Sequence, residues 1–466
     1  MNKYLIASMV VLIAGASCSP QKKSDSAENS FTGKEGEVKL ITLDPGHFHA
    51  ALVQKSSYPQ VSKDVYVYAP AGDDLQEHLK KIEAYNSRPE SPTAWNEIVY
   101  TGPDFLQKMI AEKKGNVMVT AGNNGKKTDY IKQVLSAGIH VLADKPMAIN
   151  TANFEQLKEC FEIANQKGVM LYDIMTERHE ITTILQRELS LLPSVYGTQL
   201  TGSLEDPAIV KESVHHFFKV VSGNPLKRPA WFFDVEQQGE GIVDVSTHLV
   251  DMIQWEAFPN VVIDYNTDIE LLDANRWPTP MTPAQFNEVT GTDHYPDYLM
   301  KDVEGETLNV YANGDIHYKI KGIHAKVLVK WNYTYPEGGG DTHFSVMKGS
   351  LSNLVIRQDK EQNYKPELFI EATGVKDIPA YEATLQNDIK AVANKFPGIS
   401  LIKINEGVWQ VMIPSEYRVG HEAHFGQVTE NFLQYLIDGK LPDWEVPNMI
   451  TKYYITTKAL EMAKNK

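Results

Sequence analysis

A lysine at the end of a predicted buried strand is the first residue whose position suits chemistry. Lys145 follows the apolar run 139–143 and precedes Pro146. Proline cannot continue a sheet ladder and disfavours helical geometry at the residue before it, so we expect Lys145 at the mouth of a strand. Open α/β sheets bind their ligands at this edge. The alternative interpretation is a solvated turn lysine.

A second motif combines an aspartate with a histidine. Asp244 and His248 are four residues apart, and Asp251 follows one turn later. A helix that starts at the glycine-containing run 238–241 would place all three side chains on one face. Histidine suits a general base because its unperturbed pKa lies near neutrality. A first-turn acid favoured by the helix dipole and a satisfied core histidine are the alternative interpretations.

The elements around these motifs indicate two domains, as the length of 466 residues also suggests. Strand-like runs alternate with helical patterns between residues 38 and 175, which predicts a Rossmann-type doubly wound parallel sheet. From residue 176 onward strand-like runs dominate, with helices at 425–437 and 450–464, which predicts an α+β domain with a mostly antiparallel sheet. The expected strands are 195–203, 308–310, 317–320, 326–333 and 368–371, with hairpin turns at 320–325 and 336–341.

Composition and charge exclude several classes of protein. The chain carries 45 basic and 60 acidic residues, a net charge of −15, and has no basic cluster outside its N-terminal region. Nucleic acid is therefore not an expected partner. Two cysteines exclude a disulfide framework and a cysteine zinc site.

The N-terminal region is predicted to be a targeting segment. The apolar run 4–16 follows Lys3 and is too short to span a bilayer, which is typical of a signal peptide over residues 1–17. Gly15-Ala16-Ser17-Cys18 resembles a bacterial lipobox, which implies an acylated Cys18 and a polar tether over 18–37. We expect an exported protein, lipid-anchored to the periplasmic or cell-surface face of a Gram-negative membrane. The alternative is plain secretion with Cys18 removed.

The two motifs resemble those of a known family. AGIHVLADKPMA (137–148) and the segment 238–255 are similar to segments of the Gfo/Idh/MocA oxidoreductases, the family of glucose–fructose oxidoreductase and inositol dehydrogenase. The resemblance implies an NAD(P)-binding Rossmann-like domain over 38–175 and a substrate-binding domain with an open-faced sheet over 176–466. It implies catalytic roles for Lys145, which contacts cofactor and substrate, for Asp244, which orients, and for His248, the base.

The resemblance also places a phosphate-binding glycine loop at residues 44–49. Only Gly46 remains, because Asp44 and His49 occupy the first and third glycine positions. A carboxylate at the first position repels a pyrophosphate unless it points away. The expected cofactor is NAD or NADP, tightly bound because an exported enzyme has no free cytoplasmic pool. The expected cofactor-binding residues are Gly46, His47, Phe48, Asp73, Gly122, Asn123, Asn124, Lys145 and Pro146.

The function that follows is hydride transfer between a nicotinamide cofactor and a sugar or glycoside hydroxyl. Arg178, Trp231 and Asp251 are the expected substrate-binding residues. One alternative is an NAD-dependent glycoside-cleaving enzyme of the same family. Another is a non-catalytic sugar-binding lipoprotein that has lost the cofactor, which the altered loop favours. The resemblance also implies a possible homo-oligomer.

Histidine pairs leave a metal site as a further alternative. The pairs are His47 and His49, His215 and His216, and His421 and His424. Three or four of these side chains would have to converge in space. The leading interpretation therefore contains no metal.

Overall fold

The computed structural model describes residues 31–221, 224–336 and 338–466. The predicted signal peptide (1–17) and Cys18 lie outside the described residues. The end of the predicted tether is packed, since the Phe31 ring lies 5.3 Å from the ring of His140. No helix in the described part of the chain is both long and apolar enough to cross a membrane.

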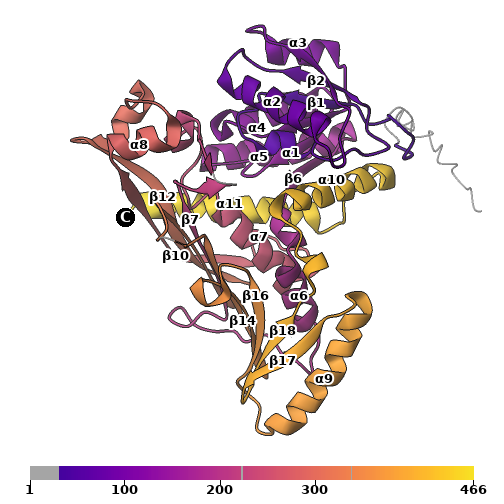
Figure 1. Cartoon of the computed structure of the whole chain (residues 1–466), viewed down its shortest axis with the longest axis vertical. Coiled ribbons are helices and arrows are strands. Elements are labelled where there is room, and N and C mark those ends of the chain that lie inside the picture. Colours follow the sequence, from indigo (N-terminus) through magenta and orange to yellow (C-terminus); the bar gives the residue numbers. More distant parts are fainter. Residues whose placement is uncertain (1–30, 222–223, 337) are drawn as a thin grey trace, which may run out of the picture.

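A six-stranded parallel sheet forms the first domain (Figure 1), in the order β3-β2-β1-β4-β5-β6. Its strands are β1 (Leu40–Leu43), β2 (Asp64–Tyr68), β3 (Asn96–Tyr100), β4 (Val117–Thr120), β5 (His140–Asp144) and β6 (Leu171–Ile174). The helices between them are α1 (His49–Leu52), α2 (Asp73–Ser87), α3 (Phe105–Glu112), α4 (Asn124–Ser136) and α5 (Thr151–Lys167). Every residue of β1, β4, β5 and β6 is buried, as parallel strands covered by helices require. This confirms the predicted doubly wound sheet.

A ten-stranded sheet forms most of the second domain, in the order β10-β12-β13-β7-β14-β15-β16-β18-β17, with β11 paired to β12. Its strands are β7 (Ile209–His216), β10 (Ile269–Met281), β11 (Val303–Glu304), β12 (Thr307–Ile320), β13 (Ile323–Asn332), β14 (Thr342–Lys348), β15 (Ser352–Gln358), β16 (Glu367–Ala372), β17 (Ser400–Asn405) and β18 (Val408–Met412). All neighbouring pairs are antiparallel except β13 and β7. This confirms the predicted mostly antiparallel sheet.

Two local predictions in this domain are wrong. Residues 195–203 form turns with isolated bridges instead of a strand, because Gly197 and Gly202 adopt positive φ there. Residues 336–341 do not form a hairpin turn, because β7 lies between β13 and β14. The predicted hairpin at 320–325 is confirmed by the pairing of Ile320 with Ile323.

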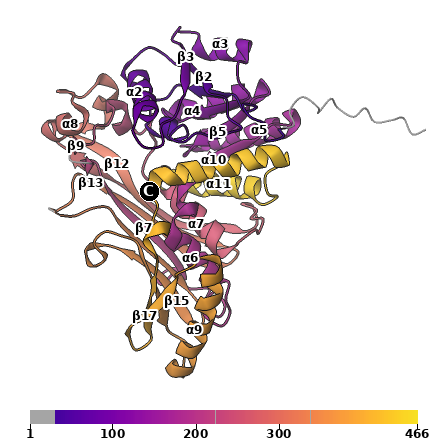
Figure 2. The same ribbon diagram turned by 45° about the vertical axis from the view of Figure 1, so that its right-hand side comes forward.

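Helices of the second domain pack on its sheet or against the first domain. They include α6 (Ile181–Ser190), α7 (Ser246–Ala257), α10 (His421–Asp438) and α11 (Glu445–Lys464). Figures 1 and 2 show α10 and α11 beneath the first domain. Phe425 and Phe432 of α10 and Tyr453 of α11 belong to the first domain's hydrophobic core. The C-terminal helices therefore complete the domain that the N-terminal half begins.

Candidate active site

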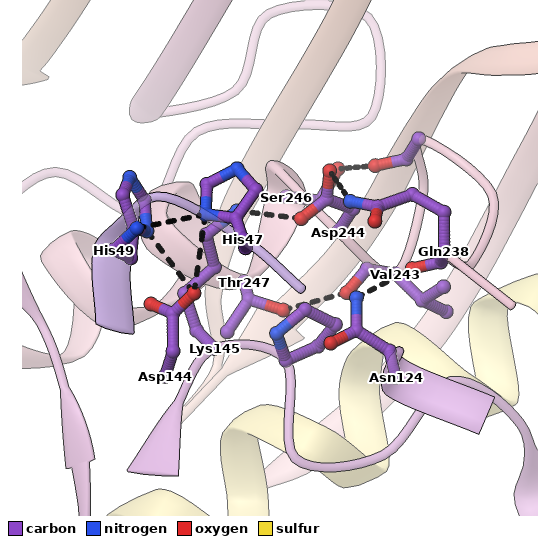
Figure 3. Close-up of polar contacts among 12 residues, drawn as sticks. His47, His49, Asn124, Asp144, Lys145, Gln238, Val243, Asp244, Ser246 and Thr247 are labelled. Carbon is purple, nitrogen blue, oxygen red and sulfur yellow. Dashed lines mark hydrogen bonds and ion pairs between the residues drawn. The ribbon is translucent and has the colours of Figure 1, made fainter. Parts of the chain in front are cut away.

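Lys145 and Asp244 meet where the two domains face each other. Lys145 follows β5, and its Nζ lies 2.5 Å from Oδ1 of Asp244, which precedes α7 (Figure 3). The other Asp244 oxygen accepts a hydrogen bond from Gln238 Nε2 at 3.1 Å. The side chains of Lys145 and Asp244 are only 11% and 8% exposed. The pair is thus weakly screened by solvent, and it fixes the ammonium at the mouth of the strand.

His248 lines the same space from α7. Its Nδ1 is buried and has no hydrogen-bond partner among the residues that the structure describes. Burial, followed by the charge of Lys145, holds the pKa of His248 well below its usual range. The imidazole is therefore neutral and can accept a proton.

The predicted helical face of Asp244, His248 and Asp251 is not observed. The helix begins only at Ser246, so Asp244 lies in the turn before it. Asp251 lies outside the cavity lining and pairs with Arg178 instead. Residues 239 and 240 have no regular structure and 241–245 form turns. Gly241 packs against the backbone of Ala312, where a Cβ atom would lie 1.8 Å from the carbonyl oxygen.

A cavity of about 510 Å³ surrounds Lys145, Asp244 and His248. This volume is in the range of pockets for small organic ligands. Further titratable groups in its wall are Glu177, Glu180, His215, Arg228, Asp341 and His343. The cavity can thus bind a polar molecule through many hydrogen bonds.

Glu177 is the cavity residue whose protonation is most relevant at neutral pH. Burial, reinforced by the nearby charge of Glu180, raises its pKa to about 7. A carboxyl group with this pKa can donate a proton at physiological pH. Glu177 is not among the site residues predicted from the sequence.

The loop between β1 and α1 keeps one feature of a phosphate loop. Asp44 adopts φ 47°, a conformation that favours glycine. Its Oδ2 accepts a hydrogen bond of 2.8 Å from the hydroxyl of Tyr130. That carboxylate oxygen is therefore held by a hydrogen bond within the first domain.

The rest of this loop does not fit a pyrophosphate in the arrangement observed. The N–H groups of Gly46 and His47 both donate to the carbonyl oxygen of Ala121 at 3.1 Å. Trp231 donates a hydrogen bond of 3.0 Å to Asp74 and lies 3.1 Å from the position of a Cβ atom on Gly46. The following helix, α1, is a single turn. The backbone donors and the space that a dinucleotide phosphate needs are therefore occupied by the protein itself.

Where the β1–α1 loop meets the cavity, the residues suit a nicotinamide group. Lys145 and His248 line the open space, and the carbonyl oxygen of Asp44 lies 2.6 Å from the position of a Cβ atom on Gly122 in the wall. A ligand that enters here meets a cation, a proton acceptor and a wall without a side chain.

Several predicted cofactor residues lie apart from the cavity. His47, Phe48, Gly122, Asn124 and Lys145 line it, and Gly46, Asp73, Asn123 and Pro146 do not. Asp73 begins α2 and is exposed, and Asn123 caps α4 and binds Gln237 at 2.8 Å. The carbonyl oxygen of Pro146 accepts a hydrogen bond from Lys127.

The three predicted substrate residues also lie outside the cavity lining. Arg178 donates hydrogen bonds of 2.6 and 2.7 Å to Asp251 and one of 2.7 Å to Glu445. Asp251 also pairs with Lys452 at 2.8 Å, and Lys452 pairs with Asp173 at the same distance. This buried charge network joins β6, α7 and α11, and it suits a structural role.

The histidine pairs converge only in part. His47 and His49 lie beside Asp144, whereas His215 and His216 pair with Asp341. His421 lines the cavity, and the ring of His49 lies 5.4 Å from it. Asp341 and Arg228 had no local sequence signal, because their neighbourhood in the cavity depends on the order of the strands.

Two family models match the chain. Residues 185–464, more than half of the chain, match a family described as "Putative oxidoreductase C terminal domain". Residues 65–173 match "Oxidoreductase family, NAD-binding Rossmann fold". The second match begins in β2, after the loop that binds phosphate in such folds.

Individual relatives differ in how much of the chain they share. Biliverdin reductase A of Mus musculus is 31% identical over 128 residues, and the human enzyme is 30% identical; each match covers 27% of this chain and 40% of the relative. The chain thus spans less than half the length of these curated relatives. A "putative oxidoreductase" from Parabacteroides merdae has a crystal structure with 70% identity and a TM-score of 0.92, covering 94% of this chain and 99% of that one. Levoglucosan dehydrogenase in complex with NADH and levoglucosan shares the fold at a TM-score of 0.59 and 12% identity, over 92% of this chain and 97% of that one.

Proposed function

Because this chain belongs to the Gfo/Idh/MocA oxidoreductase family, we propose that it oxidises or reduces a hydroxyl-bearing carbon of a sugar or glycoside. The observation that carries the proposal is the 2.5 Å pair of Lys145 and Asp244 in one cavity with His248. Levoglucosan, an anhydrosugar, is the ligand in one solved structure of this fold, which supports the substrate class.

We assign a separate role in such a reaction to each of the three side chains. His248, neutral because of its burial, accepts the hydroxyl proton as the carbonyl forms. The Lys145 ammonium stabilises the negative charge on the substrate oxygen, and Asp244 holds that ammonium in place. A nicotinamide cofactor, when bound, supplies the hydride acceptor or donor. In the reductive direction His248 returns the proton.

The proposed cofactor is NAD or NADP that stays bound between turnovers. The description of the matched Rossmann family supports a nicotinamide dinucleotide. Admission of its phosphates at the β1–α1 loop requires Trp231 to leave Gly46. The proposed retention between turnovers rests on the expected export, because an exported enzyme has no free cytoplasmic pool of the cofactor.

Glycoside cleavage is a second candidate, because Glu177 lines the same cavity. With a pKa of about 7 it is able to protonate a leaving oxygen. Turnover of a glycoside without an external oxidant would favour this candidate over simple oxidation.

We also propose export and lipid anchoring through Cys18, on the strength of the N-terminal sequence. A Cys18→Ser variant should then lose incorporated fatty acid and leave the membrane fraction. Retention of both by the variant would contradict the anchor without affecting the proposed activity.

The decisive experiment for the activity is identification of what the purified chain holds. The chain from residue 19 onward is denatured, and the released small molecules are identified by mass spectrometry. NAD or NADP in the supernatant supports the oxidoreductase, which is then screened with sugars in the presence and absence of an acceptor. A protein that is empty and also fails to bind added NAD or NADP overturns both enzyme candidates and favours a non-catalytic sugar-binding protein.

A further inference from the structure

Two histidines and an aspartate form a compact cluster in the wall of the cavity. Nδ1 of His49 lies 3.0 Å from Oδ2 of Asp144, and Nδ1 of His47 lies 3.9 Å from the same oxygen (Figure 3). These three atoms all lie within 4.8 Å of one another. They come from α1, the loop before it and the end of β5.

The Asp144 carboxylate has an acceptor that the protein leaves unused. Asp144 is 4% exposed, and within the described residues its Oδ1 has no hydrogen-bond partner. The two nearest lysines do not satisfy it. Lys127 bonds to the main-chain oxygen of Asp144, and the Lys145 ammonium pairs with Asp244. A buried carboxylate oxygen without a partner is costly, which points to a ligand at this position.

We propose that His47, His49 and Asp144 bind a divalent transition-metal ion of the zinc, cobalt or iron(II) type. Two imidazoles and one carboxylate are a common ligand set for such ions. Two atoms that each lie about 2.0–2.1 Å from one ion are themselves roughly 3–3.5 Å apart, so small side-chain rotations suffice to close the site. All three residues line the cavity. The metal site takes a hydroxyl or carbonyl oxygen of a bound molecule as its further ligand.

In a neighbouring cluster of the cavity, the carboxylate already has a cationic partner. His215 and His216 also pair with one carboxylate, that of Asp341. There the ammonium of Lys219 bonds to the same carboxylate and occupies the place of a cation. The His47 cluster has no lysine on its carboxylate among the described residues, which is why we assign the metal to it.

The test is metal binding by the full chain without substrate or cofactor, so its result is independent of the proposed activity. Chelator-treated protein is titrated with Co²⁺ and with Zn²⁺, followed by visible absorption of the cobalt form and by metal analysis after gel filtration. We expect one ion per chain and visible cobalt bands. His47→Gln and Asp144→Asn should each weaken binding at least ~10-fold.

His215→Gln is the matched control, because it removes a histidine of the same cavity outside the cluster. It should bind Co²⁺ as the unchanged chain does. The His47 side chain is 20% exposed, so His47→Gln keeps the test interpretable if Asp144→Asn fails to fold. The proposal is overturned if the chain takes up no Co²⁺, if folded His47→Gln binds it unchanged, or if His215→Gln loses it equally.

Discussion

The Lys145 ammonium lies 2.5 Å from the Asp244 carboxylate, although 99 residues separate them in the chain. Lys145 ends a strand of the parallel sheet, and Asp244 belongs to the domain built on the other sheet. The contact therefore forms only when the two domains are in place. It links the arrangement of the domains to the chemistry of the cavity.

Removal of Lys145 or His248 is expected to abolish turnover with the fold retained. Lys145→Met removes the charge that stabilises the substrate oxygen, and His248→Ala removes the proton acceptor, each at a cost of about 10²–10⁴ in kcat/KM. Steady-state kinetics measures the loss, and circular dichroism checks the fold. Lys132→Met, which breaks the surface pair with Glu159, is the control and should change neither. Full activity in both cavity variants would contradict the site.

Glu177 is expected to make stability depend on pH. Its folded pKa of about 7 exceeds the ordinary value of 4.5, so between these values the folded chain holds a proton that the unfolded chain releases. This contribution to the free energy of unfolding, up to about 3 kcal/mol, is therefore present at low pH and is lost as pH rises through 7. The free energy of unfolding, measured with denaturant at about pH 5 and about pH 8, should fall less between these two pH values for Glu177→Gln than for the unchanged chain. Equal declines would show that Glu177 titrates normally.

Arg178 is expected to support the fold instead of binding substrate. Arg178→Met removes the guanidinium from the buried carboxylate of Glu445 and leaves Asp251 with Lys452 alone, at a cost of about 3–5 kcal/mol in the free energy of unfolding. Urea unfolding measures this loss. Lys395→Met, which breaks an ion pair with Glu188 at the surface, is the control and should cost no more than about 1 kcal/mol. Unchanged stability with a raised KM would instead restore the predicted substrate role of Arg178.

Trp231 is expected to oppose the binding of a dinucleotide at the β1–α1 loop. Trp231→Ala uncovers Gly46 and removes the hydrogen bond to Asp74, so the variant should bind NAD or NADP more tightly than the unchanged chain. Trp231→Phe keeps most of the ring and loses only the hydrogen bond, and it should lie between the two. Isothermal titration measures the affinities. Weaker binding by Trp231→Ala would show that the indole contacts the cofactor.

The sheets were predictable where the sequence pattern is local. Runs such as 117–119 and 141–143 are apolar throughout and buried, and each is followed by a turn or helix signal. The strand predicted at 195–203 failed because glycines at 197 and 202 break the pattern. The order of the strands in the second sheet was not predictable, since β7 joins β13 and β14 from more than a hundred residues away.

The site was predictable where a motif ends a strand, as at Lys145. The motif of Asp244 and His248 identified two residues that line one cavity with Lys145, although the helix that was to align them starts later than expected. The cluster of His49 with Asp144 joins residues 95 apart, and no spacing in the sequence reveals such a contact. The sequence did not predict the ion pairs of Arg178, because both partners lie far along the chain.

The packing of α10 and α11 against the first domain limits how this protein can be divided. Phe425, Phe432 and Tyr453 are buried among the residues of the parallel sheet and its helices. A fragment that ends with β6 would expose that apolar surface to water. Helix α11 also packs into the core of the second domain through Ile455, Ala459 and Leu460. A chimera that exchanges the large sheet for that of a relative must therefore keep α10 and α11 with the N-terminal half and also preserve this second contact of α11.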